Sequence, residues 1–192
     1  MRRLRSNPGR RVAGLATCRA DGLSRCQPER VSGNVAAKFM LFLVFQVGAD
    51  RHAIEAARVI EVLAMVELRK IAGAPVGTAG EFVYRGEPVP VLDLCQLALG
   101  RPSNLRLSTR IILLRHEPQR GVMKPLGLVA EHATELAQKS LTEFTAVGEA
   151  LIAPDPRGQL RLLQLDKLLS PELRDLLAVY YFTQTLETEP TA

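Results

Sequence analysis

Apolar residues along most of the chain fall into short runs of strand length, and turn-forming residues separate the runs. Residues 41–47 read Leu-Phe-Leu-Val-Phe-Gln-Val, which is typical of a strand that begins buried on both faces. Gly48 to Asp50 indicates a turn, and residues 52–56 predict a second short strand. Residues 57–63 fit either a short helix or an extended segment. The part of the chain with a regular apolar pattern therefore begins as β-structure.

Residues 80–94 predict a β-hairpin. Two strand-like runs flank a turn at residues 85–87, whose sequence is Arg-Gly-Glu. Pro88 and Pro90 lie two residues apart, so both remove an N–H donor from the same side of the second strand. This spacing predicts an edge strand. A helical turn follows and is expected to end at Gly100.

Short apolar runs continue through the second half of the chain and end in a helix. Strands are predicted at residues 110–114, 125–129, 133–137, 150–152 and 160–165. For the helix, Ser170 is a favourable N-cap and Pro171 suits the first helical position. An apolar stripe follows at helical spacing, formed by Leu173, Leu176, Leu177, Tyr180 and Tyr181. Many short strands with one terminal helix predict an all-β barrel or sandwich.

Residues 1–39 differ from the rest of the chain in charge and in pattern. They hold nine of the 25 basic residues but only two of the 20 acidic ones, so this segment carries +7 and the remainder −2. They show no apolar period, so we interpret them as a basic disordered N-terminal extension, with Met40 as an alternative start site. A second interpretation is a basic arm that binds nucleic acid or anionic lipid, although the acidic body has the wrong charge for a phosphate-binding surface. The folded domain is predicted over residues 40–186.

No sequence pattern predicts catalysis, a cofactor or a metal. Cys18, Cys26 and Cys95 follow neither a disulfide framework nor a zinc spacing. The three histidines have no partner at metal-ligand spacing, and phosphate-binding and nucleophile motifs are missing. The longest apolar run, residues 39–45, is roughly a third of a membrane-spanning helix. We therefore expect a non-enzymatic protein without catalytic residues, cofactor, metal site or membrane insertion.

Two charged residues of the hairpin are candidates for a specific role. Arg85 lies at a tight turn before Gly86, where a held guanidinium can order a partner carboxylate or cap a groove. The alternative is an ordinary solvated turn cation. Asp93 follows the apolar run of the second strand and is interpreted as an acceptor for backbone N–H groups or for Arg85.

Several of these segments resemble the CheW family of coupling proteins. The most specific block is residues 84–94, Tyr-Arg-Gly-Glu-Pro-Val-Pro-Val-Leu-Asp-Leu, which is similar to the family's Asn-x-Arg-Gly…Pro-Val-Ile-Asp-Leu signature. Residues 59–62, Val-Ile-Glu-Val, are similar to its Val-x-Glu-Ile segment, and residues 41–45 resemble its opening strand. Residues 126–129 and 160–169 resemble its second-half strands. The likeness covers about residues 40–180.

The resemblance implies an all-β fold of two small five-stranded β-barrels packed together around a shared apolar core, with a C-terminal α-helix. It implies a cytoplasmic signal-transduction adaptor of a two-component system, recruited to membrane receptor arrays. The implied partners are the regulatory domain of a CheA-type histidine kinase and the cytoplasmic tip of a methyl-accepting chemoreceptor. By match to the motifs, the implied protein-binding residues are Val59, Glu61, Arg85 and Gly86.

Two positions depart from the family pattern. Val83 stands where the signature has its Asn, and Ala130-Glu131 replaces the usual Val-Asp of the second half. With these departures and the sequence Phe-Val-Tyr-Arg-Gly at residues 82–86, the chain resembles the couplers of Wsp-type surface-sensing pathways, which feed cyclic di-GMP synthesis.

Overall fold

The computed structural model describes residues 39–119 and 121–187. Residues 1–38 of the predicted N-terminal extension lie outside the described residues. The first described strand begins at Phe39.

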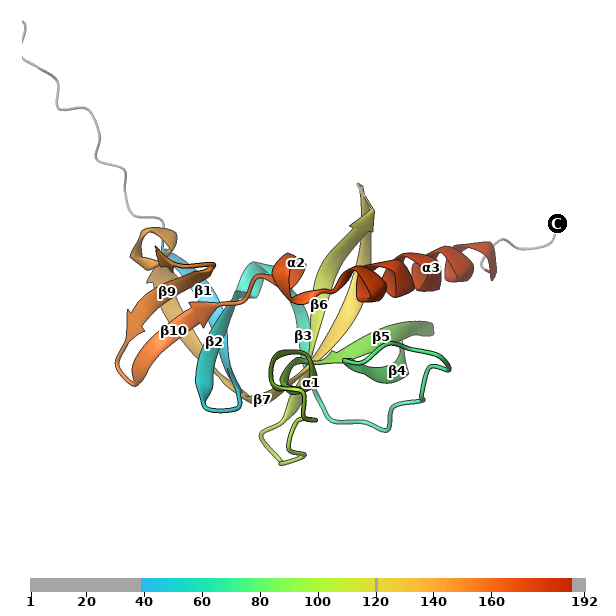
Figure 1. Ribbon diagram of the computed structural model, residues 1–192, viewed down its shortest axis with the longest axis horizontal. Coiled ribbons are helices and arrows are strands. Elements are labelled where there is room, and N and C mark those ends of the chain that lie inside the picture. The colour runs from blue at the N-terminus through green and yellow to red at the C-terminus, as the bar shows by residue number, and fades with distance from the viewer. Residues whose placement is uncertain (1–38, 120, 188–192) are drawn as a thin grey trace, which may run out of the picture. The chain divides into compact units, whose positions relative to one another are not determined.

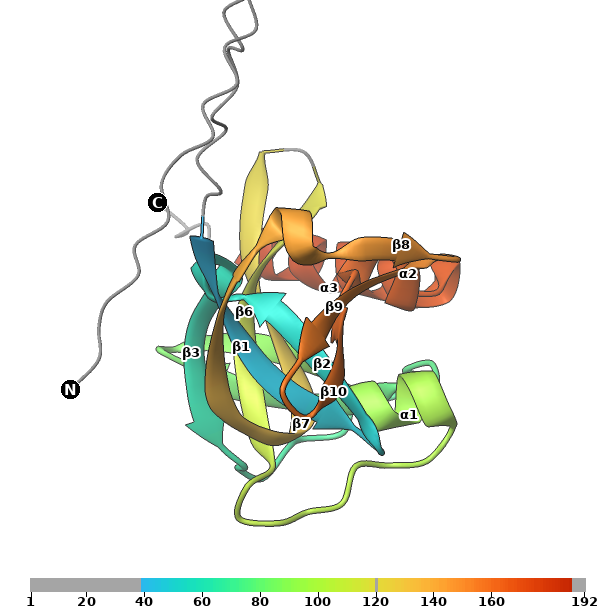
Figure 2. The same cartoon turned by 90° about the vertical axis from the view of Figure 1, so that its left-hand side faces the viewer.

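The first barrel joins the beginning of the folded chain to its end. Strand β1 pairs with β2, β2 with β10, β10 with β9, and β9 with β8. The β2–β10 pair is parallel and the others are antiparallel, so residues more than a hundred positions apart lie side by side (Figure 2). Its strands are β1 (Phe39–Val47), β2 (Asp50–Glu55), β8 (Thr145–Val147), β9 (Ala150–Asp155) and β10 (Gly158–Leu162).

The second barrel is built from the middle of the chain. Strand β6 pairs with β3 on one side and with β7 on the other, and β5 lies between β4 and β7. The two barrels stand next to each other in Figure 1. The strands of the second barrel are β3 (Val59–Ala64), β4 (Thr78–Tyr84), β5 (Glu87–Asp93), β6 (Arg110–Gln119) and β7 (Val122–Ser140).

Strand β7 belongs to both barrels. Its first half pairs with β5 and β6, and its second half pairs with β1. The register against β1 jumps from Glu131 opposite Gln46 to Glu135 opposite Val44, so β7 carries extra residues at this point. His132, inside the bulge, has a φ of 49°. A bulge with one left-handed residue bends a strand sharply, which lets β7 pass from one barrel to the other.

The apolar core follows the alternation of side chains along these strands. On β1, Phe42 and Val44 point into the first barrel, whereas Leu43 and Phe45 point into a larger core shared by both barrels. Residues of β6 and β7 also enter the shared core, while Val91 belongs to a smaller cluster inside the second barrel. The prediction that the opening strand is buried on both faces is confirmed for residues 42–45, whereas Leu41, at the start of the predicted run, is 47% exposed.

The helices pack against the shared core. The predicted helical turn is α1 (Leu94–Leu99), which ends at Gly100 with a φ of 69°. The predicted C-terminal helix is α3 (Pro171–Glu187), and its stripe of Leu173, Leu177 and Tyr181 is buried in the shared core. The remaining helical elements are α2 (Leu165–Leu168) and the 3₁₀ turns η1 (Ala56–Arg58) and η2 (Leu141–Glu143).

Two details of the predicted elements are wrong. The strand expected at residues 160–165 ends at Leu162, because Leu165 starts α2. Strand β5 is not an edge strand throughout, since residues 91–93 pair with β7. Pro88 and Pro90 precede this ladder, so their missing N–H groups do not interrupt it. The all-β class, the paired barrels and the terminal helix are confirmed.

Candidate protein-binding site

The β4–β5 turn presents Arg85 at a fixed position. Tyr84 pairs with Glu87, so Arg85 and Gly86 form a two-residue hairpin loop. Both have positive φ, 52° for Arg85 and 89° for Gly86, which is the geometry of the primed turns that match strand twist. Gly86 adopts this conformation at little cost, and Arg85 is the strained member of the pair. The sequence prediction of a tight turn is confirmed.

Tyr84 connects Arg85 to Glu61. The Tyr84 hydroxyl donates a hydrogen bond of 2.6 Å to Oε2 of Glu61 on β3. The Arg85 guanidinium lies over the Tyr84 ring, with Cζ 5.1 Å from its centroid, a cation–π distance. The hydrogen bond to Glu61 raises the pKa of the Tyr84 phenol above its ordinary value, followed by a smaller effect of burial, while Arg85 acts in the opposite direction. Three side chains thus form one polar cluster.

This cluster spans a seam of the second barrel. Among the described strands, β3 pairs only with β6, and β4 only with β5. The Glu61–Tyr84 hydrogen bond therefore joins two strands that share no ladder. Val62 and Val83, the sequence neighbours of Glu61 and Tyr84, are 38% and 69% exposed, and strand alternation points them to the other face of their strands. Charged groups that are held in place on an exposed surface are suited to specific protein binding.

Val59 packs against the shared core and not against the polar cluster. It is opposite Leu114 on β6, and a bulge shifts the register between Val59 and Glu61. Its side chain is half-buried against the shared core. The structure therefore brings together Glu61, Arg85 and Gly86 of the four predicted site residues, whereas Val59 contributes mainly to the core.

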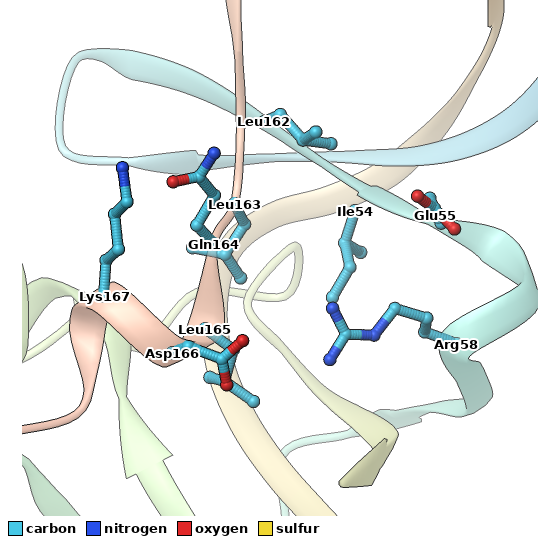
Figure 3. A pocket seen from close by; sticks show the side chains of 9 residues that line it. All are labelled: Ile54, Glu55, Arg58, Leu162, Leu163, Gln164, Leu165, Asp166 and Lys167. Carbon is cyan, nitrogen blue, oxygen red and sulfur yellow. The ribbon is translucent and has the colours of Figure 1, made fainter. Parts of the chain in front are cut away.

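A pocket of about 240 Å³ opens beside the first barrel, at the η1 turn that precedes β3. One wall comes from Ile54, Glu55 and Arg58, and the other from residues 162–167, which connect β10 to α2 (Figure 3). Arg58 and Asp166 face each other across it. The Gln164 side-chain oxygen is buried and has no hydrogen-bond partner among the described residues. A pocket with aliphatic side chains at its base and charged side chains at its edge is suited to binding an amphipathic segment of a partner protein.

Asp93 anchors the loop after the hairpin. Its carboxylate accepts hydrogen bonds from the backbone N–H groups of Cys95, Gln96 and Ser103, and from the Ser103 hydroxyl. The predicted role as a backbone acceptor is confirmed, and the alternative pairing with Arg85 is wrong.

Within the described ranges, no group of three His, Cys, Asp or Glu side chains is placed to hold a metal ion. None of the described helices is both long and apolar enough to cross a membrane.

Comparison with known proteins settles the family. A family model described as CheW-like domain matches residues 41–157. The chain belongs to the CheW-like domain family. This CheW-like chain is 28% identical to the chemotaxis protein CheW of Klebsiella aerogenes over 174 residues, covering 84% of the chain and 93% of that relative. Its fold is similar to the crystal structure of the scaffolding protein TtCheW from Thermoanaerobacter tengcongensis, with a TM-score of 0.62 at 18% identity, over 73% of this chain and 94% of that one.

The family gives this CheW-like chain its broad role. CheW-like proteins are scaffolds and adaptors rather than enzymes, and this chain is a signal-transduction adaptor of the chemotaxis type. Sequence reasoning identified Arg85 and Glu61 but missed Tyr84, which links them. A tyrosine directly before a predicted turn was the available signal. Its contact with Glu61, 23 residues away, depends on how the barrel closes and is invisible in local sequence.

Proposed function

We propose that this chain couples the regulatory domain of a CheA-type histidine kinase to the cytoplasmic tip of a methyl-accepting chemoreceptor. The docking surface consists of Glu61, Tyr84, Arg85 and Gly86 at the seam, together with Val59 and the pocket that Arg58 and Asp166 line. The observation that carries this proposal is the Glu61–Tyr84–Arg85 cluster, which holds an exposed carboxylate of β3 and an exposed guanidinium of the β4–β5 turn on one tyrosine. The chain works in the cytoplasm, at receptor arrays, because its partners are there.

Coupling of this kind requires no chemical step. When one protein binds both a receptor and a kinase, a change of receptor state alters the free energy of the shared interface and so shifts the kinase equilibrium. In this proposal the pocket at η1 and the charged seam contact different partners. The resemblance to Wsp-type couplers stays a prediction about which pathway supplies them.

The alternative of nucleic-acid binding rests on the basic segment 1–39, and none of the relatives supports it. We propose that this segment is an extension outside the 40–186 domain. Limited proteolysis should remove it and leave the domain folded.

The docking surface can be tested with Arg85→Ala and Glu61→Gln. Both side chains are exposed, so the variants should keep the wild-type melting temperature. Arg85→Ala should weaken binding of the kinase regulatory domain or of the receptor fragment by about tenfold, measured by calorimetry. Arg157→Ala is the matched control, because Arg157 is also an exposed arginine of a two-residue hairpin loop. Wild-type affinity of both variants for both partners would reject this surface.

Val59→Asp is unsuitable as a surface probe. The half-buried side chain packs against the shared core, so a carboxylate there should destabilise the fold.

A further inference from the structure

Three independent contacts converge on Tyr84. Its hydroxyl donates to Glu61, its ring lies under the Arg85 guanidinium, and its edge packs against Phe82 with ring centroids 6.3 Å apart. Phe82 in turn packs against the core of the second barrel. Phe82 therefore fixes the Tyr84 ring from the side of the barrel core. The fixed ring and its hydroxyl in turn contact the two charged groups, Arg85 and Glu61.

The effect of these contacts is to fix the two charges relative to each other. An exposed glutamate or arginine normally samples many rotamers, and a partner that binds it must order the side chain. Here the hydrogen bond orders the Glu61 carboxylate, and the cation–π contact orders the Arg85 guanidinium. The carboxylate retains a second oxygen, and the guanidinium its fork of donors, for a partner.

We propose that Tyr84 is the positioning residue of the docking surface. It pre-orders Glu61 and Arg85 as a pair of opposite charges and thereby selects a partner segment that carries a basic group for Glu61 and an acidic group for Arg85. This inference rests on the proposed function, since it assigns the geometry and charge preference of the same surface.

A purely structural role for Tyr84 predicts different behaviour. If the tyrosine served only to close the seam between β3 and β4, its removal would lower the melting temperature, and binding would fall only as far as folding fell. A positioning role predicts weaker binding at unchanged stability. It also predicts that replacing Tyr84 weakens partner binding less when Glu61 has already been replaced.

The test compares Tyr84→Phe, which removes the hydroxyl, with Tyr84→Leu, which also removes the ring. The binding partners are the purified kinase regulatory domain and the receptor cytoplasmic fragment, titrated by calorimetry against the full chain. We expect Tyr84→Phe to weaken binding by about threefold and Tyr84→Leu by about tenfold. Tyr181→Phe is the control, because that hydroxyl donates to the Pro125 carbonyl in the shared core, away from the seam.

A double-mutant cycle provides the decisive readout. In the Glu61→Gln background, Tyr84→Phe should cause less loss than in the wild type, because the pre-ordered carboxylate is already absent. Additive losses, or losses matched by a lower melting temperature, would overturn the positioning role. Wild-type binding by both Tyr84 variants while Arg85→Ala binds weakly would also overturn it and leave the proposed function intact. Wild-type binding by Arg85→Ala and Glu61→Gln as well would reject the proposed function itself.

Discussion

At the scale of single residues, Asp93 organises the chain after the hairpin. One carboxylate accepts two backbone N–H groups at the start of α1 and a backbone and a side-chain donor from Ser103. The helix begins where it does because its first amides are satisfied by this cap. Ser103, at the end of the following loop, donates to the same two carboxylate oxygens. Asp93 therefore fixes both the start of α1 and this loop.

Replacing Asp93 by Asn should destabilise the protein by about 2 kcal/mol, because an amide NH₂ then faces donors in place of an acceptor. Chemical denaturation measures this change in the free energy of unfolding. Asp175→Asn, on the exposed side of α3, serves as the control and should change stability little. Equal stabilities of the two variants would mean that the Asp93 cap is not needed.

His116 should make stability depend on pH. Its side chain is 8% exposed, and burial lowers its pKa below the ordinary value of 6.5; Asp166 opposes this shift and Arg58 adds to it. The unfolded chain takes up a proton near 6.5 while the folded chain keeps the ring neutral, so stability is fully present above 6.5 and falls as the pH drops below it.

The free energy of unfolding should therefore decline between about pH 7.5 and about 5.5, and less steeply in His116→Gln. Part of the decline should persist in the variant, because burial also lowers the pKa of His52. Denaturant titrations at several pH values give the two slopes. Identical slopes would show that His116 is not held neutral by the fold.

At the scale of elements, the bend of β7 is what allows two barrels to share a strand. His132 adopts a left-handed backbone at this bend, which costs free energy for every residue except glycine. His132→Gly should therefore raise the free energy of unfolding by about 1 kcal/mol. Gln138→Gly, at a regular exposed position of the same strand, should lower it by about 0.5 kcal/mol. The same sign for both variants in thermal or chemical denaturation would contradict this account.

Most elements could be predicted because their signals are local. The two-residue turn at Arg85-Gly86, the stop at Gly100 and the apolar stripe of α3 each depend on residues close in sequence. The edge-strand prediction for β5 failed because prolines report only on their own N–H positions. The ladder with β7 begins one residue after Pro90, and it forms with residues more than thirty positions away.

The candidate site was predictable only in part, for the same reason. Arg85 and Glu61 lie in recognisable motifs, but the contact that unites them crosses a seam without a ladder. The burial of Val59 likewise follows from how β3 packs over the shared core, which alternation along a six-residue strand with a bulge does not reveal.

At the scale of the whole domain, the shared core makes the two barrels one folding unit. Its members come from β1, β5, β6, β7 and α3, and no single barrel contains all of them. The pocket between Ile54 and Asp166 lies beside this core, and its lining comes from β2, η1, β10 and the segment that leads into α2. This arrangement suits an adaptor, because partners that bind to different barrels then contact one folding unit.

The most direct test of the central claim is a three-component binding measurement. The receptor cytoplasmic fragment is immobilised, and retention of the kinase regulatory domain is measured with and without this chain. The kinase domain should be retained only when the chain is present, and retention should fall with Arg85→Ala but stay at the wild-type level with Arg157→Ala. Retention that is independent of the chain, or that survives Arg85→Ala unchanged, would contradict coupling through the β4–β5 turn.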